Sequence, residues 1–204
     1  MSSHFFALFS RMKNINRWAL MRNTKEESLA SHALEAAAIA HCLALIGNTR
    51  LGKNYPAADL AVMGMYHDLP EILTGDMPTP AKYYSPAIRE AYQQIETAAA
   101  RSILETLPAD LRPAYAGLLQ PDETQETYRL LKAADKISAL IKCIEERNTG
   151  NLEFSAAERQ TLAALHAIEC EEAEIFLTEF MDSYSEVLDA VLKKEEGPTW
   201  TSGN

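Results

Sequence analysis

Two histidines and two aspartates give this chain the donor atoms of a metal site. His32 lies in an alanine-rich segment, His67 and Asp68 are adjacent, and Asp135 lies in the segment LLKAADKISALIKCI. Imidazole nitrogens combined with carboxylate oxygens suit a divalent transition ion (Co, Mn, Fe, Ni, Cu or Zn) better than Mg or Ca, which prefer oxygen ligands alone. The four residues therefore indicate a mixed nitrogen and oxygen site for one such ion.

Each of these residues also has an ordinary structural interpretation. A single histidine in a helix is most often a packed core or surface residue, and a His-Asp dipeptide is common by chance. The helical neighbours of Asp135 at i−4, i+3 and i+4 (Leu131, Ser138 and Ala139) carry no charge, so its carboxylate needs either a metal or a partner side chain. Spacing along the chain leaves open whether that partner is an ion or an unidentified arginine.

The segments that must position these residues are predicted to be helices. Only 8 glycines and 9 prolines occur, and no long stretch alternates apolar with polar residues as a strand does. Thr24 and Glu27 have the spacing of a capping box, and Gly47 is expected to end the helix that follows. The expected helices cover residues 4–13, 28–47, 56–67, 86–107, 108–119, 122–148, 155–180 and 182–195.

Prolines interrupt the segment after the His-Asp pair. Pro70, Pro78 and Pro80 predict that residues 69–85 are irregular, with room for about one helical turn. No internal repeat or low-complexity linker divides the chain. We therefore expect one all-α domain over residues 1–195, followed by a polar tail at residues 196–204.

Charge is distributed unevenly along the chain. The formal net charge is −10, which argues against general binding to a nucleic acid polymer, because such binding needs many cations along the phosphates. Residues 1–25 nevertheless contain five basic side chains and no acidic one. This segment suits a small anionic ligand, although a solvated cationic surface explains the charge equally well.

Composition also bears on location. No apolar run approaches the roughly 18 residues of a membrane span. The N-terminal segment has its apolar residues before its charged ones, unlike a secretory signal. The three cysteines are far apart, which argues against a disulfide framework. We therefore expect a cytoplasmic protein that does not contact a membrane.

The order of the four candidate ligands, written H…HD…D, resembles that of the HD-domain metal-dependent phosphohydrolases. Three segments are similar to a narrower group, the bacterial 5′-deoxynucleotidases of the YfbR type: SHFFALFSRMKNINRWALMRN, MYHDLPEILTGDMPTPAKYY and LLKAADKISALIKCIEE. The resemblance extends over nearly the whole chain and weakens only toward its C-terminal end. It implies a single HD-domain helical bundle and homodimer formation.

The resemblance also implies a role for each site residue. His32, His67, Asp68 and Asp135 would bind one divalent ion, and Glu71 would position or deprotonate the attacking water. In the substrate site, the implied contacts are Arg17 to the 5′-phosphate, Trp18 against the position of a ribose 2′-hydroxyl, and Asp76 and Thr79 to the sugar and phosphate end.

The implied activity is hydrolysis of a 2′-deoxyribonucleoside 5′-monophosphate to the deoxynucleoside and phosphate. Another HD phosphohydrolase activity, on a cyclic nucleotide, a deoxynucleoside triphosphate or an alarmone, stays open, as does a non-catalytic nucleotide sensor. The sequence departs from the family pattern at two places. Ser31 precedes His32 where relatives often have glutamate, and Pro70 replaces a small polar residue. The first departure removes an acid that could orient His32.

Overall fold

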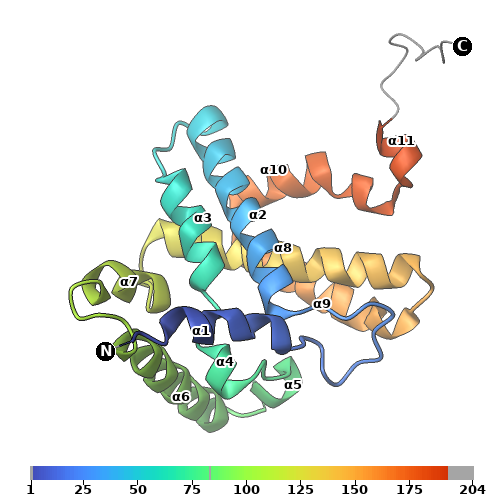
Figure 1. The fold of residues 1–204 in the computed structure, drawn as a ribbon. Helices are drawn as coiled ribbons and strands as arrows, with labels where there is room; N and C mark the ends of the chain where they lie inside the picture. Colours follow the sequence, from blue (N-terminus) through green and yellow to red (C-terminus); the bar gives the residue numbers. More distant parts are fainter. Residues whose placement is uncertain (1, 83, 193–204) are drawn as a thin grey trace, which may run out of the picture.

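The structure is a computed structural model that describes residues 2–82 and 84–192, and this part of the chain consists of helices joined by loops (Figure 1). Among these residues the only strand-like pairing is an isolated antiparallel bridge between Asn16 and Ser28. The prediction of an all-α fold is confirmed. In chain order, the elements are Phe5–Phe9 (α1), Ser10–Asn14 (η1, a 3-10 helix), Leu29–Arg50 (α2), Ala57–Tyr66 (α3), Glu71–Thr74 (α4), Thr79–Lys82 (α5), Pro86–Glu105 (α6), Arg112–Leu119 (α7), Glu126–Asn148 (α8), Leu152–Phe154 (η2), Ser155–His166 (α9), Glu171–Phe180 (α10), Asp182–Ser185 (η3) and Leu188–Leu192 (α11).

The core forms where α2 and α8 pack at the centre of the molecule (Figure 1). Alanines on both helices are fully buried, including Ala36 and Ala44 on α2 and Ala133 on α8. Their short side chains allow the two backbones to approach closely, and α3, α9 and α10 pack around this pair. A second buried cluster joins α1 to α6 and α7 through Phe5 and Ile103, and the first turn of α2 contributes to it.

Helix α2 has the length and hydropathy of a membrane span, contrary to the expectation that no such segment occurs. An 18-residue stretch of α2 has a mean hydropathy of 1.6, but 56% of that stretch is buried inside the fold. Eleven of its residues, from Leu29 to Gly47, are buried. Its apolar character is therefore accounted for by its central position in the helical core.

The predicted capping box of Thr24 and Glu27 is wrong. Ser28 is the N-cap of α2: its Oγ accepts a hydrogen bond from the backbone N–H of Ser31 (3.1 Å), and Ser31 Oγ accepts one from the N–H of Ser28 (3.1 Å). Thr24 instead donates through its hydroxyl to Glu146 on α8 (2.7 Å). Thr24 therefore makes a tertiary contact with α8 instead of capping α2.

Other helix ends also differ from the prediction. Helix α2 does not end at Gly47 but continues to Arg50. Gly47 instead permits close packing, because a Cβ there would lie 2.6 Å from the Tyr55 ring. Residues 155–180 form two helices rather than one. They separate at Glu169, which adopts φ 55°, and Arg129 Nη1 donates to its carbonyl oxygen (2.9 Å). Two one-turn helices, α4 and α5, lie within 69–85, and the predicted polar tail lies outside the described residues.

Candidate metal centre and substrate cavity

The structure brings the four predicted metal ligands together, although they come from three separate parts of the chain. Each residue offers one ligand atom, and these atoms all lie within 4.8 Å of one another. His32 Nε2 lies 3.2 Å from Asp135 Oδ1 and 3.4 Å from Asp68 Oδ2. His67 Nε2 lies 3.1 Å from the same oxygen of Asp68. Helix α2, the turn after α3, and α8 therefore converge at one point.

The two histidine rings are oriented by contacts on their outer nitrogens. The Nδ1–H of His67 donates to the carbonyl oxygen of Gly64 (2.8 Å), and His32 Nδ1 lies 2.9 Å from the Oγ of Ser138. Both Nε2 atoms are buried and have no directional hydrogen bond among the described residues. Unpaired buried ring nitrogens that face two carboxylates are what a transition ion requires, so the residues fit a metal.

A close helix contact places the His-Asp pair beside α2. Gly64 on α3 meets the backbone of Ala37 on α2, and a side chain at position 64 would overlap with it. Helix α3 ends at Tyr66, and His67 and Asp68 follow directly in the turn. The pair therefore lies next to His32, which is five residues before Ala37 on α2.

Pro70 does not break the turn after the His-Asp pair. It adopts helical angles (φ −55°, ψ −26°) at the start of α4, where a missing backbone N–H leaves no partner unpaired. The N–H of Glu71 donates to the carbonyl of Asp68 (3.0 Å). Glu71 is thereby held one turn beyond Asp68, on the same side as the ligands.

The electrostatics of the cluster favour ionised aspartates. Burial alone would raise the pKa of Asp68, but His67 and His32 hold it well below its usual range. Burial likewise opposes ionisation of Asp135, while Lys136 and the two histidines hold its pKa well below the ordinary value. Both carboxylates are therefore anionic and available as ligands at neutral pH.

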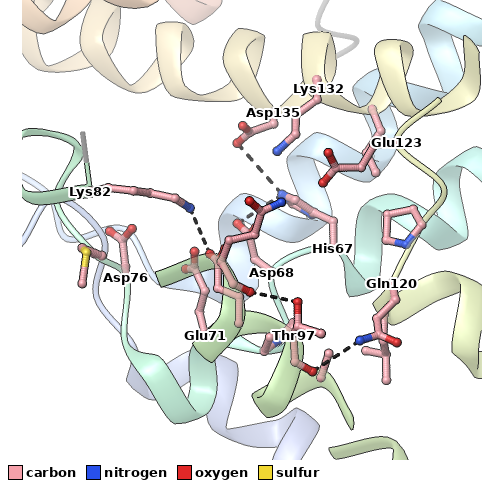
Figure 2. A pocket seen from close by; sticks show the side chains of 18 of the residues that line it. His67, Asp68, Glu71, Asp76, Lys82, Thr97, Gln120, Glu123, Lys132 and Asp135 are labelled. Carbon is pink, nitrogen blue, oxygen red and sulfur yellow. Dashed lines mark hydrogen bonds and ion pairs between the residues drawn. The ribbon is translucent and has the colours of Figure 1, made fainter. Parts of the chain in front are cut away.

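A cavity of about 470 Å³ opens beside the four ligands (Figure 2). His67, Asp68 and Asp135 line one end of it, and Glu71 and Asp76 lie along its wall. The Oε2 atom of Glu71 is buried and has no hydrogen-bond partner among the described residues. Burial, together with the charges of Asp68 and Asp76, raises the pKa of Glu71 to about 10. A cation held by Asp68 would offset part of that repulsion and favour the ionised form.

The N-terminal segment supplies a cation to this cavity. Arg17 lines it, and only 11% of the Arg17 side chain is exposed. Glu27 Oε2 accepts hydrogen bonds from both Arg17 Nη1 (2.7 Å) and Trp18 Nε1 (2.9 Å). The guanidinium is therefore held in one orientation, and it faces the carboxylates of the metal cluster, which are among its electrostatic partners.

Trp18 occupies a strained position at the junction of two loops. Its φ is 60°, in the left-handed region that a bulky side chain rarely adopts. Its backbone N–H donates to Asp76 Oδ2 (3.3 Å), and its ring packs against Phe154 with centroids 5.3 Å apart. Trp18 is not among the residues that line the cavity, whereas Asp76 and Thr79 are.

Several residues of the site were not found from the sequence. The sequence indicates only a capping role for Glu27, and it does not indicate the three lysines of the cavity, which are Lys82, Lys132 and Lys136. Lys136 Nζ lies 3.1 Å from Asp135 Oδ2. Lys132 lies three residues before Asp135, and this helical spacing was the one signal that pointed to it.

Comparison with known proteins identifies the family. The family profile described as 5′-deoxynucleotidase YfbR-like matches residues 4–184. A 5′-deoxynucleotidase of Photobacterium profundum is 43% identical over 190 residues, which cover 93% of this chain and 98% of the relative. A 5′-deoxynucleotidase of Photorhabdus temperata is 42% identical over 193 residues, covering 93% and 96%. The chain belongs to the YfbR-like 5′-deoxynucleotidase family.

Solved structures agree with this membership. An HD-domain phosphohydrolase of Listeria innocua superposes with a TM-score of 0.78 at 25% identity, covering 89% of this chain and 88% of that one. An HD phosphohydrolase of cyanophage S-2L, bound to dA and one catalytic Zn²⁺ ion, shares the fold at a TM-score of 0.51 and 18% identity, covering 88% of each chain. The predicted HD-domain helical bundle is thereby confirmed as the architecture of this family member.

Proposed function

We propose that this protein is a metal-dependent 5′-deoxynucleotidase that hydrolyses 2′-deoxyribonucleoside 5′-monophosphates to the deoxynucleoside and phosphate. The observation that carries the proposal is the cluster of His32, His67, Asp68 and Asp135 at the end of a cavity that also contains Glu71 and Arg17. The activity follows that of its YfbR-like relatives, which are named 5′-deoxynucleotidases.

The ion is proposed to be one divalent transition metal per chain. Two imidazole nitrogens and two carboxylate oxygens favour Co, Mn, Fe, Ni, Cu or Zn over Mg or Ca. When bound, such an ion supplies Lewis acidity at the phosphoryl group and lowers the pKa of water. The ligands His32, His67, Asp68 and Asp135 would hold it.

Glu71 is proposed to accept the proton of the attacking water. Its carboxyl is buried on the cavity wall with one oxygen unpaired, so it can hold a water molecule by a hydrogen bond. As the water oxygen bonds to phosphorus, its proton passes to Glu71. The bond from phosphorus to the 5′-oxygen then breaks. That oxygen takes up a proton from solvent and Glu71 releases its proton to solvent, so the products are the deoxynucleoside and hydrogen phosphate.

Arg17 is proposed to bind the 5′-phosphate. A guanidinium held on one side by Glu27 still offers donors to phosphate oxygens, and its positive charge offsets the charge that develops during the reaction. Asp76 and Thr79 line the same cavity and are proposed to contact the sugar and phosphate end. Neither role requires contact with the base, so we expect weak base preference.

Trp18 is proposed to exclude ribonucleotides. Trp18 does not itself line the cavity, but its backbone N–H donates to Asp76, which does, and its ring is held by Glu27 and Phe154. Its proposed effect on the space beside the sugar is therefore exerted through Asp76. If Trp18 has this role, Trp18→Ala will raise activity toward AMP relative to dAMP. Equal hydrolysis of AMP and dAMP by the unaltered protein would exclude it.

The protein is also proposed to be a cytoplasmic homodimer that binds neither membranes nor nucleic acid polymers. Large apolar side chains are exposed on two adjoining helices: Leu34 and Leu45 on α2, and Val62 and Met65 on α3. Burial of such residues against a second copy would remove apolar surface from water. Light scattering after size exclusion measures the assembly state directly.

The decisive experiment is phosphate release from dAMP, AMP, a cyclic nucleotide and dGTP, with Mn²⁺ or Co²⁺ added. Preference for dAMP supports the proposal, whereas turnover confined to the cyclic nucleotide or dGTP indicates another HD phosphohydrolase. Glu71→Ala should bind metal and dAMP but release no phosphate. A protein that binds dAMP and metal but turns over none of the four is a sensor.

A further inference from the structure

A line of three hydrogen-bonding side chains runs from the metal cluster toward the surface between α2 and α8. His32 Nδ1 lies 2.9 Å from Ser138 Oγ, and Ser138 Oγ lies 2.6 Å from Glu35 Oε2. His32 and Ser138 are both completely buried, while Glu35 is half-buried at the outer end. Ser138 contacts both His32 and Glu35, so the state of Glu35 can reach His32 through Ser138.

The protons of this line can be assigned from donor and acceptor capacity. The separation of 2.6 Å is that of a hydroxyl bound to an ionised carboxylate, which can only accept. Ser138 therefore donates its single hydroxyl proton to Glu35 in a hydrogen bond. Ser138 Oγ can then only accept from His32, so Nδ1 carries a proton. In the neutral ring, which is the form that binds a metal, Nε2 then has the lone pair.

In the neutral form the lone pair of Nε2 points where a ligand is needed. His32 Nε2 is buried, has no hydrogen bond to any residue that the structure describes, and faces Asp135 and Asp68 at 3.2 and 3.4 Å. If Ser138 donated to Nδ1 instead, the proton would move to Nε2. That proton would then occupy the side of the ring that faces the other ligands and would have to leave before a metal binds.

The residue directly before His32 does not take part in this line. Ser31 is exposed and is used in the capping box at the start of α2. It cannot orient His32 from there. The acid at the outer end of the line is Glu35, three residues after His32 on the same helix.

We propose that Glu35 is a positioning residue, which acts through Ser138 to fix the Nδ1–H form of His32 and so prepares Nε2 for the metal. The inference rests on the metal site of the proposed function. It assigns Glu35 no contact with substrate or water. Its effect is therefore expected in metal affinity, and in turnover only where metal is limiting.

The test compares three variants of the full chain by Mn²⁺ titration against a competing chelator. Ser138→Ala removes the acceptor of Nδ1, and Glu35→Ala frees the serine proton to point at the ring. Each should weaken Mn²⁺ binding by about 10–100-fold, the usual effect of losing a partner of a ligating histidine. Glu35→Gln keeps an acceptor oxygen and should bind Mn²⁺ nearly as well as the unaltered protein.

The matched control is Glu145→Ala. Glu145 is an exposed acid on α8 whose charge acts on Glu35 but which makes no contact with Ser138 or His32. Its removal should leave Mn²⁺ affinity unchanged. A general loss of negative charge would instead weaken binding equally in Glu35→Ala and Glu145→Ala, and that result would overturn the proposal.

A second readout separates positioning from a purely structural role. In the Zn²⁺-loaded protein, the Nδ1 proton of His32 should give a slowly exchanging low-field NMR signal, which is lost or broadened in Glu35→Ala and retained in Glu35→Gln. A lower melting temperature with unchanged signal and unchanged affinity would overturn the inference. Normal metal binding without dAMP hydrolysis would overturn only the proposed function, and failure of the unaltered protein to bind Mn²⁺ would overturn both.

Discussion

A Cβ atom on Gly64 would lie 2.5 Å from the Cα of Ala37, so α3 meets α2 at a distance that only glycine permits. The contact brings His67 and Asp68 beside His32. Gly64→Ala should force the two backbones apart and destabilise the fold by about 1–3 kcal/mol, the range for overpacking. It should also reduce metal occupancy, measured by elemental analysis of the purified protein.

Gly117 on α7 provides the matched control. It is also a helical glycine, but a Cβ there would meet nothing within 4 Å. Gly117→Ala should therefore be neutral or stabilise the protein by up to about 1 kcal/mol, because alanine restricts the unfolded chain and favours helix. Equal melting temperatures for the two variants would show that the α2–α3 contact is not close enough to matter.

Glu27 holds two candidate substrate residues with one oxygen, since its Oε2 accepts from both Arg17 and Trp18. Glu27→Gln keeps the size of the side chain but removes the charge that orients the guanidinium. Hydrogen bonds to charged groups contribute about 1.5–3 kcal/mol, so KM for dAMP should rise about 10-fold or more. Glu26→Gln, at an exposed neighbour, should leave KM unchanged.

Removal of the metal should lower stability as well as activity. An ion that binds the folded chain at a concentration of 100 Kd stabilises it by about 2.7 kcal/mol, so chelation should lower the melting temperature and addition of Mn²⁺ or Co²⁺ should restore it. Asp135→Asn removes one ligand and should largely abolish this response. If Mn²⁺ stabilised Asp135→Asn as much as the unaltered protein, the ion would be binding elsewhere.

Helices with strong local patterns could be predicted from the sequence, and α8 is the clearest case, expected at 122–148 and found at Glu126–Asn148. The start of α2 could not be predicted. Two caps compete there, Thr24 with Glu27 and Ser28 with Ser31, and local spacing suits both. Which residue caps α2 depends on Glu146, which lies 122 residues after Thr24 in the chain and accepts a hydrogen bond from its hydroxyl.

The candidate site could also be predicted only in part from the sequence. The four candidate ligands could be predicted from their residue types and from the resemblance, because few side chains can bind a transition ion. Partners that orient the ligands could not be found in this way, because they are ordinary polar residues brought together by packing. In the sequence Ser138 does not differ from the other serines, and only the packing of α8 places it against His32. Glu27 has the spacing of a helix cap, and only the fold shows that it binds Arg17.

Glu146 joins the N-terminal loop to α8 and should make stability depend on pH. It is 1% exposed, and it accepts hydrogen bonds from the backbone and hydroxyl of Thr24 and from the Asn151 amide. Lys142 Nζ is also bound to it. Burial alone would raise the pKa of Glu146, but Lys142, Asn151 and Thr24 hold it well below its usual range. The loop that carries Arg17 is therefore anchored through an ionised carboxylate.

A carboxyl with a lowered pKa in the folded state contributes stability above its unfolded pKa, near 4.5, and loses that contribution as the pH falls toward the folded value. Glu146→Gln leaves Lys142 buried without its partner, so it should lower the free energy of unfolding by about 3 kcal/mol at pH 7. Urea unfolding of both proteins should give a difference that is constant above pH 5.5 or so and shrinks steadily below about pH 4.5. Glu145→Gln, at the exposed neighbouring position, should follow the unaltered protein at every pH. A difference that grows as the pH falls would mean that Glu146 is protonated in the folded protein, contrary to the environment described.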